Sequence, residues 1–113
     1  MMGIDIQEAK RFKTIVGTDK MAKIFSSYEI GYLESKNLSL ESFAGIYAAK
    51  EAIGKATGVG IQKNRLPLIE VRHRDNGAPY YYLHESIADD FLGKWHLSIS
   101  HTKSVAVAVC ISI

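Results

Sequence analysis

Three short segments, far apart in the chain, carry side chains that could act together on a phosphorylated substrate. The N-terminal run holds one carboxylate, Asp5, between two isoleucines, and a central segment holds a second carboxylate, Glu51, four residues before Lys55. A third segment ends an apolar run with His101 and Thr102. Carboxylates bind hard cations such as Mg²⁺, and cationic or hydroxyl groups bind phosphate oxygens. These residue types together indicate a magnesium-dependent transfer of a phosphoryl-type group.

Each of these groups also has a simpler alternative role. Glu51 and Lys55 stand in the favourable order for an ion pair on a helix surface, and such exposed pairs contribute little stability. Asp5 could be a surface acid on an edge strand, although Gly3 beside it permits close approach by a ligand or by backbone. A lone histidine such as His101 is more often a packed or capping residue than a ligand.

The hydroxyl groups near His101 favour ligand binding at the third segment. Ser98, Ser100 and Thr102 lie within three positions of the histidine, and hydroxyls suit contacts with phosphate or ribose. The chain has no Gly-x-Ser-x-Gly elbow and no acid at a clear triad spacing, which argues against a serine hydrolase. The remaining histidines show no metal-ligand spacing, so we interpret them as structural or surface residues.

The composition indicates one globular domain that spans residues 1–113. The chain has 113 residues, 47% of them hydrophobic, which argues against both a second core and disorder. The formal net charge of +2 is too small to indicate nucleic-acid binding. A single cysteine, Cys110, excludes an internal disulfide and is expected to be a small buried side chain. No secretory signal and no run of transmembrane length is present, so we expect a cytoplasmic protein without a membrane partner.

Three basic residues cluster just after the first segment. Lys10, Arg11 and Lys13 could attract an acidic partner and speed its encounter with the site. The simpler alternative is an ordinary solvated helix face.

Periodicity and capping signals predict an α+β fold with a long central helix beside a mostly antiparallel β-sheet. Ser26 and Glu29 form a capping box for a helix to about residue 36, and the central helix is bounded by Ser39 and Gly58. The segment 58–60 is interpreted as a loop. The other predicted elements are a strand at 3–7, a short helix at 8–15, strands at 68–74 and 80–83 around a turn at 75–77, a short helix at 86–93, and strands at 95–100 and 105–113.

Two of these elements have faces of different character. On the central helix, Ala44 and Ala48 share a face with Glu51 and Lys55, and their small size predicts room for a ligand to approach. In the C-terminal strand, bulky branched residues alternate with small ones. One face is therefore expected on the core and the other in a tight contact, which an oligomer could supply.

Several of these runs resemble a known family. The run Ala48-Ala49-Lys50-Glu51-Ala52, followed by Lys55-Ala56, resembles the holo-acyl-carrier-protein synthases, the small trimeric class of 4'-phosphopantetheinyl transferases. The turn Asp75-Asn76-Gly77-Ala78-Pro79-Tyr80 is similar to the Asn-Gly-Lys-Pro loop of that family. The segments around Asp5 and His101 match it in order and spacing. The resemblance spans nearly the whole chain and implies the 4'-phosphopantetheinyl transferase fold.

The resemblance implies a reaction and a role for each site residue. The enzyme would transfer 4'-phosphopantetheine from coenzyme A to a serine of apo-acyl carrier protein, a step that serves fatty acid and lipid biosynthesis, and release adenosine 3',5'-bisphosphate. Asp5 and Glu51 would hold Mg²⁺ together with the diphosphate oxygens, and Lys55 would neutralise the diphosphate. His101 and Thr102 would bind the phosphorylated nucleotide end of coenzyme A.

The same resemblance implies partners and an assembly. Arg11 is the first choice among the basic residues for contact with the acidic recognition helix of the carrier protein. A homotrimer would bind coenzyme A between neighbouring subunits. Either a metal-bound water or a carboxylate could deprotonate the acceptor serine.

Three positions depart from the wider pattern. Larger members of the superfamily carry a further acid at the position of Gln7, so a water is expected to fill that place here. Ile46 stands where the family commonly has arginine, and Ala78 replaces the lysine of its loop, which removes positive charge near coenzyme A phosphates. These changes leave an alternative open: a non-catalytic module of the same fold that binds a carrier protein or a nucleotide.

Overall fold

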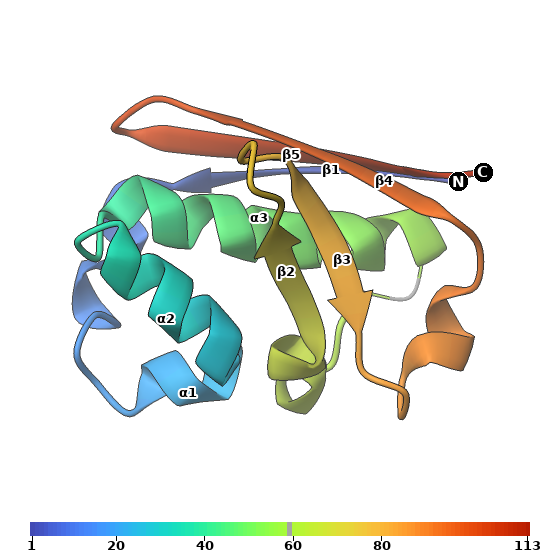
Figure 1. Ribbon diagram of the computed structural model, residues 1–113, viewed down its shortest axis with the longest axis horizontal. Coiled ribbons are helices and arrows are strands. Elements are labelled where there is room, and N and C mark those ends of the chain that lie inside the picture. The colour runs from blue at the N-terminus through green and yellow to red at the C-terminus, as the bar shows by residue number, and fades with distance from the viewer. Residues whose placement is uncertain (59) are drawn as a thin grey trace.

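A three-stranded antiparallel sheet covers one side of a long helix in the computed structural model, which describes residues 1–58 and 60–113 (Figure 1). The sheet has the strand order β1-β5-β4, and the helix is α3 (Leu40–Thr57). The strands are β1 (Met2–Glu8), β4 (Trp95–His101) and β5 (Val105–Ser112). The two chain ends meet at one end of this sheet, where Ser112 N donates to Met1 O across 2.9 Å.

Small residues allow the sheet to lie close to α3. Ala106, Ala108 and Cys110 of β5 are fully buried, and Gly3 of β1 is also buried. A Cβ atom on Gly3 would lie 1.9 Å from the carbonyl oxygen of Ala52 on α3, so only glycine permits this approach. The small face of β5 therefore packs on the core, and its bulky branched face points away from the helix.

The predicted ends of α3 are confirmed. Ser39 is the N-cap residue, although its hydroxyl bonds to that of Ser42 rather than to the backbone, and Gly58 ends the helix with a left-handed φ of 81°. Gly60 also has a positive φ, of 72°, which agrees with a loop after the helix. The remaining residue of the predicted 58–60 loop, Val59, lies outside the described residues.

A buried ion pair joins α3 to the helix α2 (Ser27–Ser35). Ser26 and Glu29 form the predicted capping box, and Glu29 Oε1 also accepts from Nζ of Lys50 across 2.8 Å. Lys50 is fully buried and donates to two further acceptors, the carbonyl oxygens of Leu66 and Ile69, at 2.6 Å each. Burial lowers the pKa of Lys50, and these hydrogen bonds offset the cost of burying its charge.

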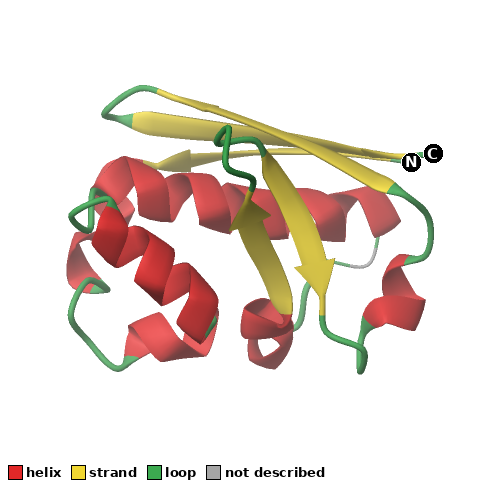
Figure 2. Cartoon of the chain, in the orientation of Figure 1, coloured by secondary structure: helices red, strands yellow, loops and turns green. Residues whose placement is uncertain are grey.

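The remaining elements lie below and in front of α3 (Figure 2). A short helix, α1 (Lys20–Ile24), and a one-turn segment, η2 (Lys63–Leu68), were not predicted. The predicted helix at 8–15 is wrong in its type and start, because β1 continues to Glu8 and a 3₁₀ helix, η1 (Ala9–Thr14), follows. The helix expected at 86–93 is only a 3₁₀ turn, η3 (Ala88–Phe91).

The hairpin predicted around the Asp75-Asn76-Gly77 turn is confirmed. Its strands are β2 (Ile69–His73) and β3 (Pro79–Leu83), which pair antiparallel. Gly77 has a positive φ of 90°, as the turn requires, and Pro79 is the first residue of its strand. All strand pairs are antiparallel and the long helix packs at their centre, so the predicted α+β class is confirmed.

Candidate functional site

Asp5 lies at the junction of β1 and α3 with both carboxylate oxygens hydrogen-bonded. The residue is only 8% exposed. Lys55 Nζ donates to Oδ1 across 2.8 Å, and Gln7 Nε2 donates to Oδ2 across 2.7 Å. The alternative of a freely solvated edge-strand acid is therefore wrong. Of the two roles considered for Gly3, the structure shows close approach by backbone. Two residues before Asp5, Gly3 lets β1 pack directly against the backbone of α3.

Lys55 pairs with Asp5 rather than with Glu51. Among the described residues its ion pair within 4.0 Å is the one to Asp5, so the alternative of a helix-surface pair between Glu51 and Lys55 is wrong. The hydrogen bond that Lys55 donates to Asp5, followed by the charge of Asp5, raises the pKa of Lys55 above its ordinary value, and the charge of Glu51 contributes less. The lysine side chain remains 57% exposed, so a ligand can reach its ammonium.

Glu51 projects from α3 one helical turn before Lys55 and is half-buried. Its charge acts on Tyr47, one further turn back: burial raises the pKa of the Tyr47 hydroxyl most, and the Glu51 carboxylate raises it further. The two predicted acids thus come from separate elements: Asp5 pairs directly with the ammonium of Lys55, and the charge of Glu51 also acts on it.

The donor set at Asp5 and Glu51 fits Mg²⁺ shared with a substrate. Within residues 1–58 and 60–113 there is no cluster of three or more His, Cys, Asp or Glu side chains that could enclose a metal. Mg²⁺ is commonly bound through one or two carboxylates while it keeps several waters and contacts substrate phosphates. Two acids beside an accessible lysine suit that mode of binding.

The structure divides the predicted basic cluster. Arg11 points toward the acids: its Nη1 donates to Gln7 Oε1 across 2.7 Å, and its guanidinium carbon lies 4.8 Å from the ring centre of Tyr47. Lys10 pairs with Glu8 instead. Lys13 lines a different cavity from Arg11, whereas Lys10 lines that cavity and also a pocket that it shares with Arg11.

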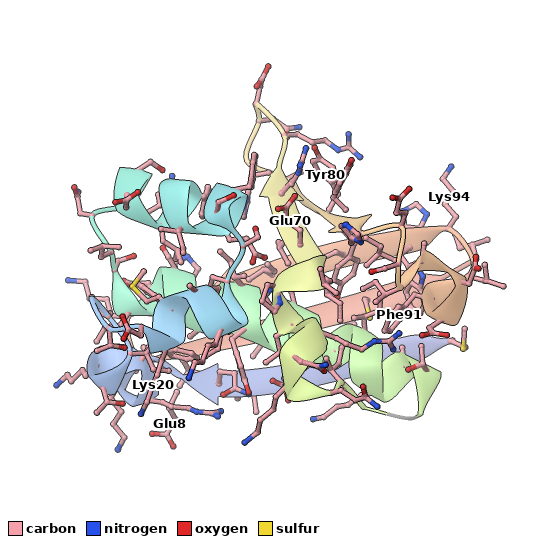
Figure 3. The ribbon with its side chains drawn as sticks, turned by 90° about the horizontal axis from the view of Figure 1, so that it is seen from below. Glu8, Lys20, Glu70, Tyr80, Phe91 and Lys94 are labelled. Carbon is pink, nitrogen blue, oxygen red and sulfur yellow. The ribbon has the colours of Figure 1, made fainter. Side chains whose placement is uncertain are left out.

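Arg11 lines a groove of about 450 Å³ with lysines from two elements that sequence reasoning missed. We call it the basic groove; its charged residues are Arg11, Lys20, Lys23 and Lys63. In the described part of the chain, none of its three lysines has a carboxylate within 4.0 Å. Its position at the same end of the molecule as Glu8 can be followed from Lys20 in Figure 3.

His101 and Asp5 belong to opposite edges of the sheet. The register places Gln7 opposite Ala106, and Ala106 opposite His101 on the other side of β5. Neighbouring strands are about 4.8 Å apart, so the backbones of Gln7 and His101, two strands apart, are separated by roughly 10 Å. Within one chain, therefore, the structure does not bring His101 to the two acids.

The three hydroxyl residues expected near His101 do not all lie on the same face of the sheet as the histidine. His101 has the same strand parity as the core-facing Ile99, so Ser98 and Ser100 point to the opposite face of the sheet. Thr102 lies in the turn after β4, and its Oγ1 accepts from the backbone N–H groups of Ser104 and Val105. Thr102 therefore shapes the turn beside His101 and remains exposed.

A small cavity of about 140 Å³ lies beside His101. Ile46, fully buried on α3, lines it, and so do Gly77 and Pro79, which flank Ala78. Both departures from the family pattern thus fall near the same cavity. Glu41 lines the cavity, and none of the described residues that line it is a lysine or an arginine.

Two site features had signals that were available in the sequence. Gln7 shares the strand face of Asp5 because it lies two positions away, and Arg11 follows it by four residues. Lys50 stands on the α3 face that also carries Ile46 and Ile53, which indicates burial of its charge. The lysines of the basic groove had no such signal, because they converge only through tertiary packing.

Across residues 1–58 and 60–113, no helix combines the length and the apolar character needed to cross a bilayer.

Comparison with known proteins gives one consistent result. Residues 1–110 match the family model described as the 4'-phosphopantetheinyl transferase superfamily. A holo-acyl-carrier-protein synthase of Caldicellulosiruptor saccharolyticus is 40% identical, with 98% of this chain and 94% of that protein aligned. A synthase of the same name from Clostridium perfringens is 36% identical over 95% of this chain and 88% of that protein.

Solved structures of the same kind share the fold. The Helicobacter pylori holo-acyl-carrier-protein synthase in complex with coenzyme A superposes with a TM-score of 0.83 at 34% identity, and the alignment covers both chains completely. The Bacillus anthracis synthase, in complex with CoA (3',5'-ADP), gives a TM-score of 0.79 at 36% identity over 96% of this chain and 91% of that one.

Proposed function

This chain belongs to the 4'-phosphopantetheinyl transferase superfamily and is an enzyme of that class, and we propose that it is a magnesium-dependent holo-acyl-carrier-protein synthase. It would transfer 4'-phosphopantetheine from coenzyme A to a serine of apo-acyl carrier protein and release adenosine 3',5'-bisphosphate. The observation that carries the proposal is the convergence of Asp5, Glu51 and Lys55 from β1 and α3. A module that only binds a carrier protein would not need two acids beside a lysine.

The residues of this site suit the chemistry of the transfer. A serine oxygen of the carrier protein would form a bond to phosphorus as the bond to the bridging diphosphate oxygen breaks, and the serine proton would pass to a base. Lys55 would bind the diphosphate oxygens, where negative charge grows in the transition state. Asp5 and Glu51 would hold Mg²⁺, which, when bound, neutralises charge on the diphosphate.

The basic groove is the proposed docking surface for the carrier protein. Arg11 keeps the role expected for it, and Lys20, Lys23 and Lys63 join it in place of Lys10 and Lys13. The groove lies beside the acids, because Arg11 contacts both Gln7 and Tyr47. Among residues 1–58 and 60–113, no carboxylate lies within 4.0 Å of the charged groups of these four cations, so they complement an acidic helix and would speed its encounter.

A homotrimer forms part of the proposal, because one chain does not complete the site. The outer face of the sheet is apolar and open: Ile4 and Ile6 are 57% and 63% exposed, and the branched side chains of β5 share that face. A patch of this kind marks an interface. Contact between copies through this face would allow His101 and Thr102 of a neighbour to approach the acids of the first chain.

Light scattering tests the trimer. The wild-type protein should have three times the mass of one chain, and Ile6→Lys should shift it to a monomer that has lost activity. A wild-type monomer with full transferase activity would contradict this part of the proposal.

Intact-protein mass spectrometry of the carrier tests the function itself. Apo-acyl carrier protein incubated with this protein, coenzyme A and Mg²⁺ should gain the mass of one phosphopantetheine group. A carrier whose serine has been replaced by alanine is the matched control and should gain nothing. Binding of the carrier without any mass gain would identify a non-catalytic module instead.

A further inference from the structure

A continuous series of hydrogen bonds connects the basic groove to Asp5. Arg11, which lines the groove, donates from Nη1 to Oε1 of Gln7 across 2.7 Å. Gln7 then donates from Nε2 to Oδ2 of Asp5 across 2.7 Å. The bonded residues follow one another at spacings of two and four at the end of β1 and the start of η1. Gln7 is therefore the single residue between a surface cation and a nearly buried carboxylate.

The chemistry of the two partners fixes the orientation of the Gln7 amide. A guanidinium has only donors and an ionised carboxylate has only acceptors. Reversing the amide would oppose two donors at Arg11 and two acceptors at Asp5, so only one orientation satisfies both groups. The amide oxygen thus faces Arg11, and Gln7 does not offer it to a cation bound by Asp5.

Arg11 is itself held from the α3 side. Its Nη2 lies 3.5 Å from the hydroxyl of Tyr47, and its guanidinium packs over the Tyr47 ring at 4.8 Å. Tyr47 stands one helical turn before Glu51. The contacts of Arg11 therefore reach both elements that carry the proposed metal ligands.

We propose that Gln7, held in place by Arg11, is a positioning residue that orients the Asp5 carboxylate for Mg²⁺ and couples it to the carrier-docking surface. The inference rests on the proposed function, because it takes Asp5 as a metal ligand. Residues that hold a metal ligand from behind are commonly worth about 10–100-fold in metal affinity. Gln7 should have an effect of this size although it touches neither the cation nor the substrates.

The variants are chosen to remove hydrogen bonds without changing charge. Gln7→Leu and Gln7→Met cannot donate to Asp5, and two different replacements guard against a folding defect in one. Arg11→Lys keeps the positive charge, but a single ammonium cannot reproduce the two-sided contact of the guanidinium fork. Gln62→Leu is the matched control, since Gln62 is exposed and its side chain makes no capping bond.

Binding of Mn²⁺, measured without substrates by electron paramagnetic resonance, tests the proposal. Mn²⁺ prefers the same oxygen ligands as Mg²⁺ and reports its own free concentration. Each Gln7 variant and Arg11→Lys should weaken binding about 10-fold or more, and Gln62→Leu should leave it unchanged. The double variant Gln7→Leu/Arg11→Lys should bind no more weakly than the weaker single variant, because the two residues act in series.

The outcomes separate this inference from the proposed function. Unchanged Mn²⁺ affinity in the Gln7 variants or in Arg11→Lys would overturn the positioning role while the metal site itself remained. Losses that multiply in the double variant would show that the two residues act independently, and would overturn the coupling. A wild-type protein that binds no Mn²⁺ would remove the metal site from the proposed function, and this inference with it.

Discussion

Nζ of Lys55 lies 2.8 Å from Oδ1 of Asp5, although the carboxylate of Glu51 stands only one helical turn away on the same helix. The lysine therefore crosses from α3 to β1 and ties together the two elements that carry the acids. An ion pair made only for helix stability would not need this crossing. The arrangement holds the ammonium against the Asp5 carboxylate and within the influence of the Glu51 charge.

Replacing Lys55 should separate catalysis from stability. Lys55→Met should reduce transfer by about 10²–10³-fold, because it removes a cation from the position where diphosphate charge develops. Urea unfolding should change little, since the ammonium is exposed. Lys94→Met, which removes an exposed charge just before β4, is the control for both measurements. Transfer kinetics equal to wild type in Lys55→Met would return the pair to a purely structural role.

Breaking the buried ion pair should destabilise the fold strongly. Lys50→Met leaves the Glu29 carboxylate buried without its cation, which typically costs about 3–5 kcal/mol in the free energy of unfolding. Glu29→Gln should have a comparable effect. The double variant should lose clearly less than the sum of the two, because the partners depend on each other. Additive losses in chemical denaturation would contradict the pairing.

The glycine of β1 should be needed for both fold and activity. Gly3→Ala places a Cβ against the Ala52 carbonyl, so β1 must move away from α3, at a cost of at least roughly 1–3 kcal/mol. Asp5 moves with the strand, and transfer should fall with it. Gly31→Ala on α2 meets no atom within 4 Å and should stabilise the helix by about 0.5–1 kcal/mol. Equal effects of the two alanines on thermal unfolding would contradict the close packing of β1.

His73 should make the fold sensitive to mild acid. Burial, and secondarily the charge of Lys36, lower the pKa of His73, whose ring stacks on Tyr32 at 3.8 Å. In the unfolded chain the imidazole takes up a proton near its ordinary value of about 6.5, whereas the folded protein resists doing so. The contribution of His73 to stability is therefore complete above about pH 6.5 and declines as the pH falls below it.

The variant His73→Phe keeps an aromatic ring against Tyr32 but cannot bind a proton. Its urea midpoint should fall less steeply than that of wild type between pH 7.5 and 5.5, a window chosen around the ordinary histidine value of about 6.5. Parallel curves for the two proteins would show that His73 does not contribute to the acid sensitivity.

Local signals in the sequence predicted the elements well where the residues act on their own backbone. Ser26 with Glu29, the bounds of α3 and the Asp75-Asn76-Gly77 turn were all predicted, because capping and turn formation depend on a few adjacent residues. The alternation of side chains along a strand also implies that Ser98 and His101, three positions apart, lie on opposite faces of the sheet.

Local sequence signals did not predict the contacts between elements that are distant in the chain. The expectation that the alanine face of α3 is open to a ligand is wrong for Ala44 and Ala48, which are fully buried. Their small size lets other elements pack closely on the helix instead. Likewise, the sequence offered Glu51 as the nearest partner of Lys55, and only the packing of β1 on α3 brings Asp5 closer.

Removal and return of the metal tests the central claim most directly. The mass gain of apo-acyl carrier protein in the presence of coenzyme A should stop when a chelator is in excess and resume at the wild-type rate when Mg²⁺ is restored. Asp5→Ala and Glu51→Ala, checked for folding by circular dichroism, should give no mass gain at any Mg²⁺ concentration. Transfer that continues at the wild-type rate in excess chelator, or in either variant, would contradict a reaction centred on these two acids.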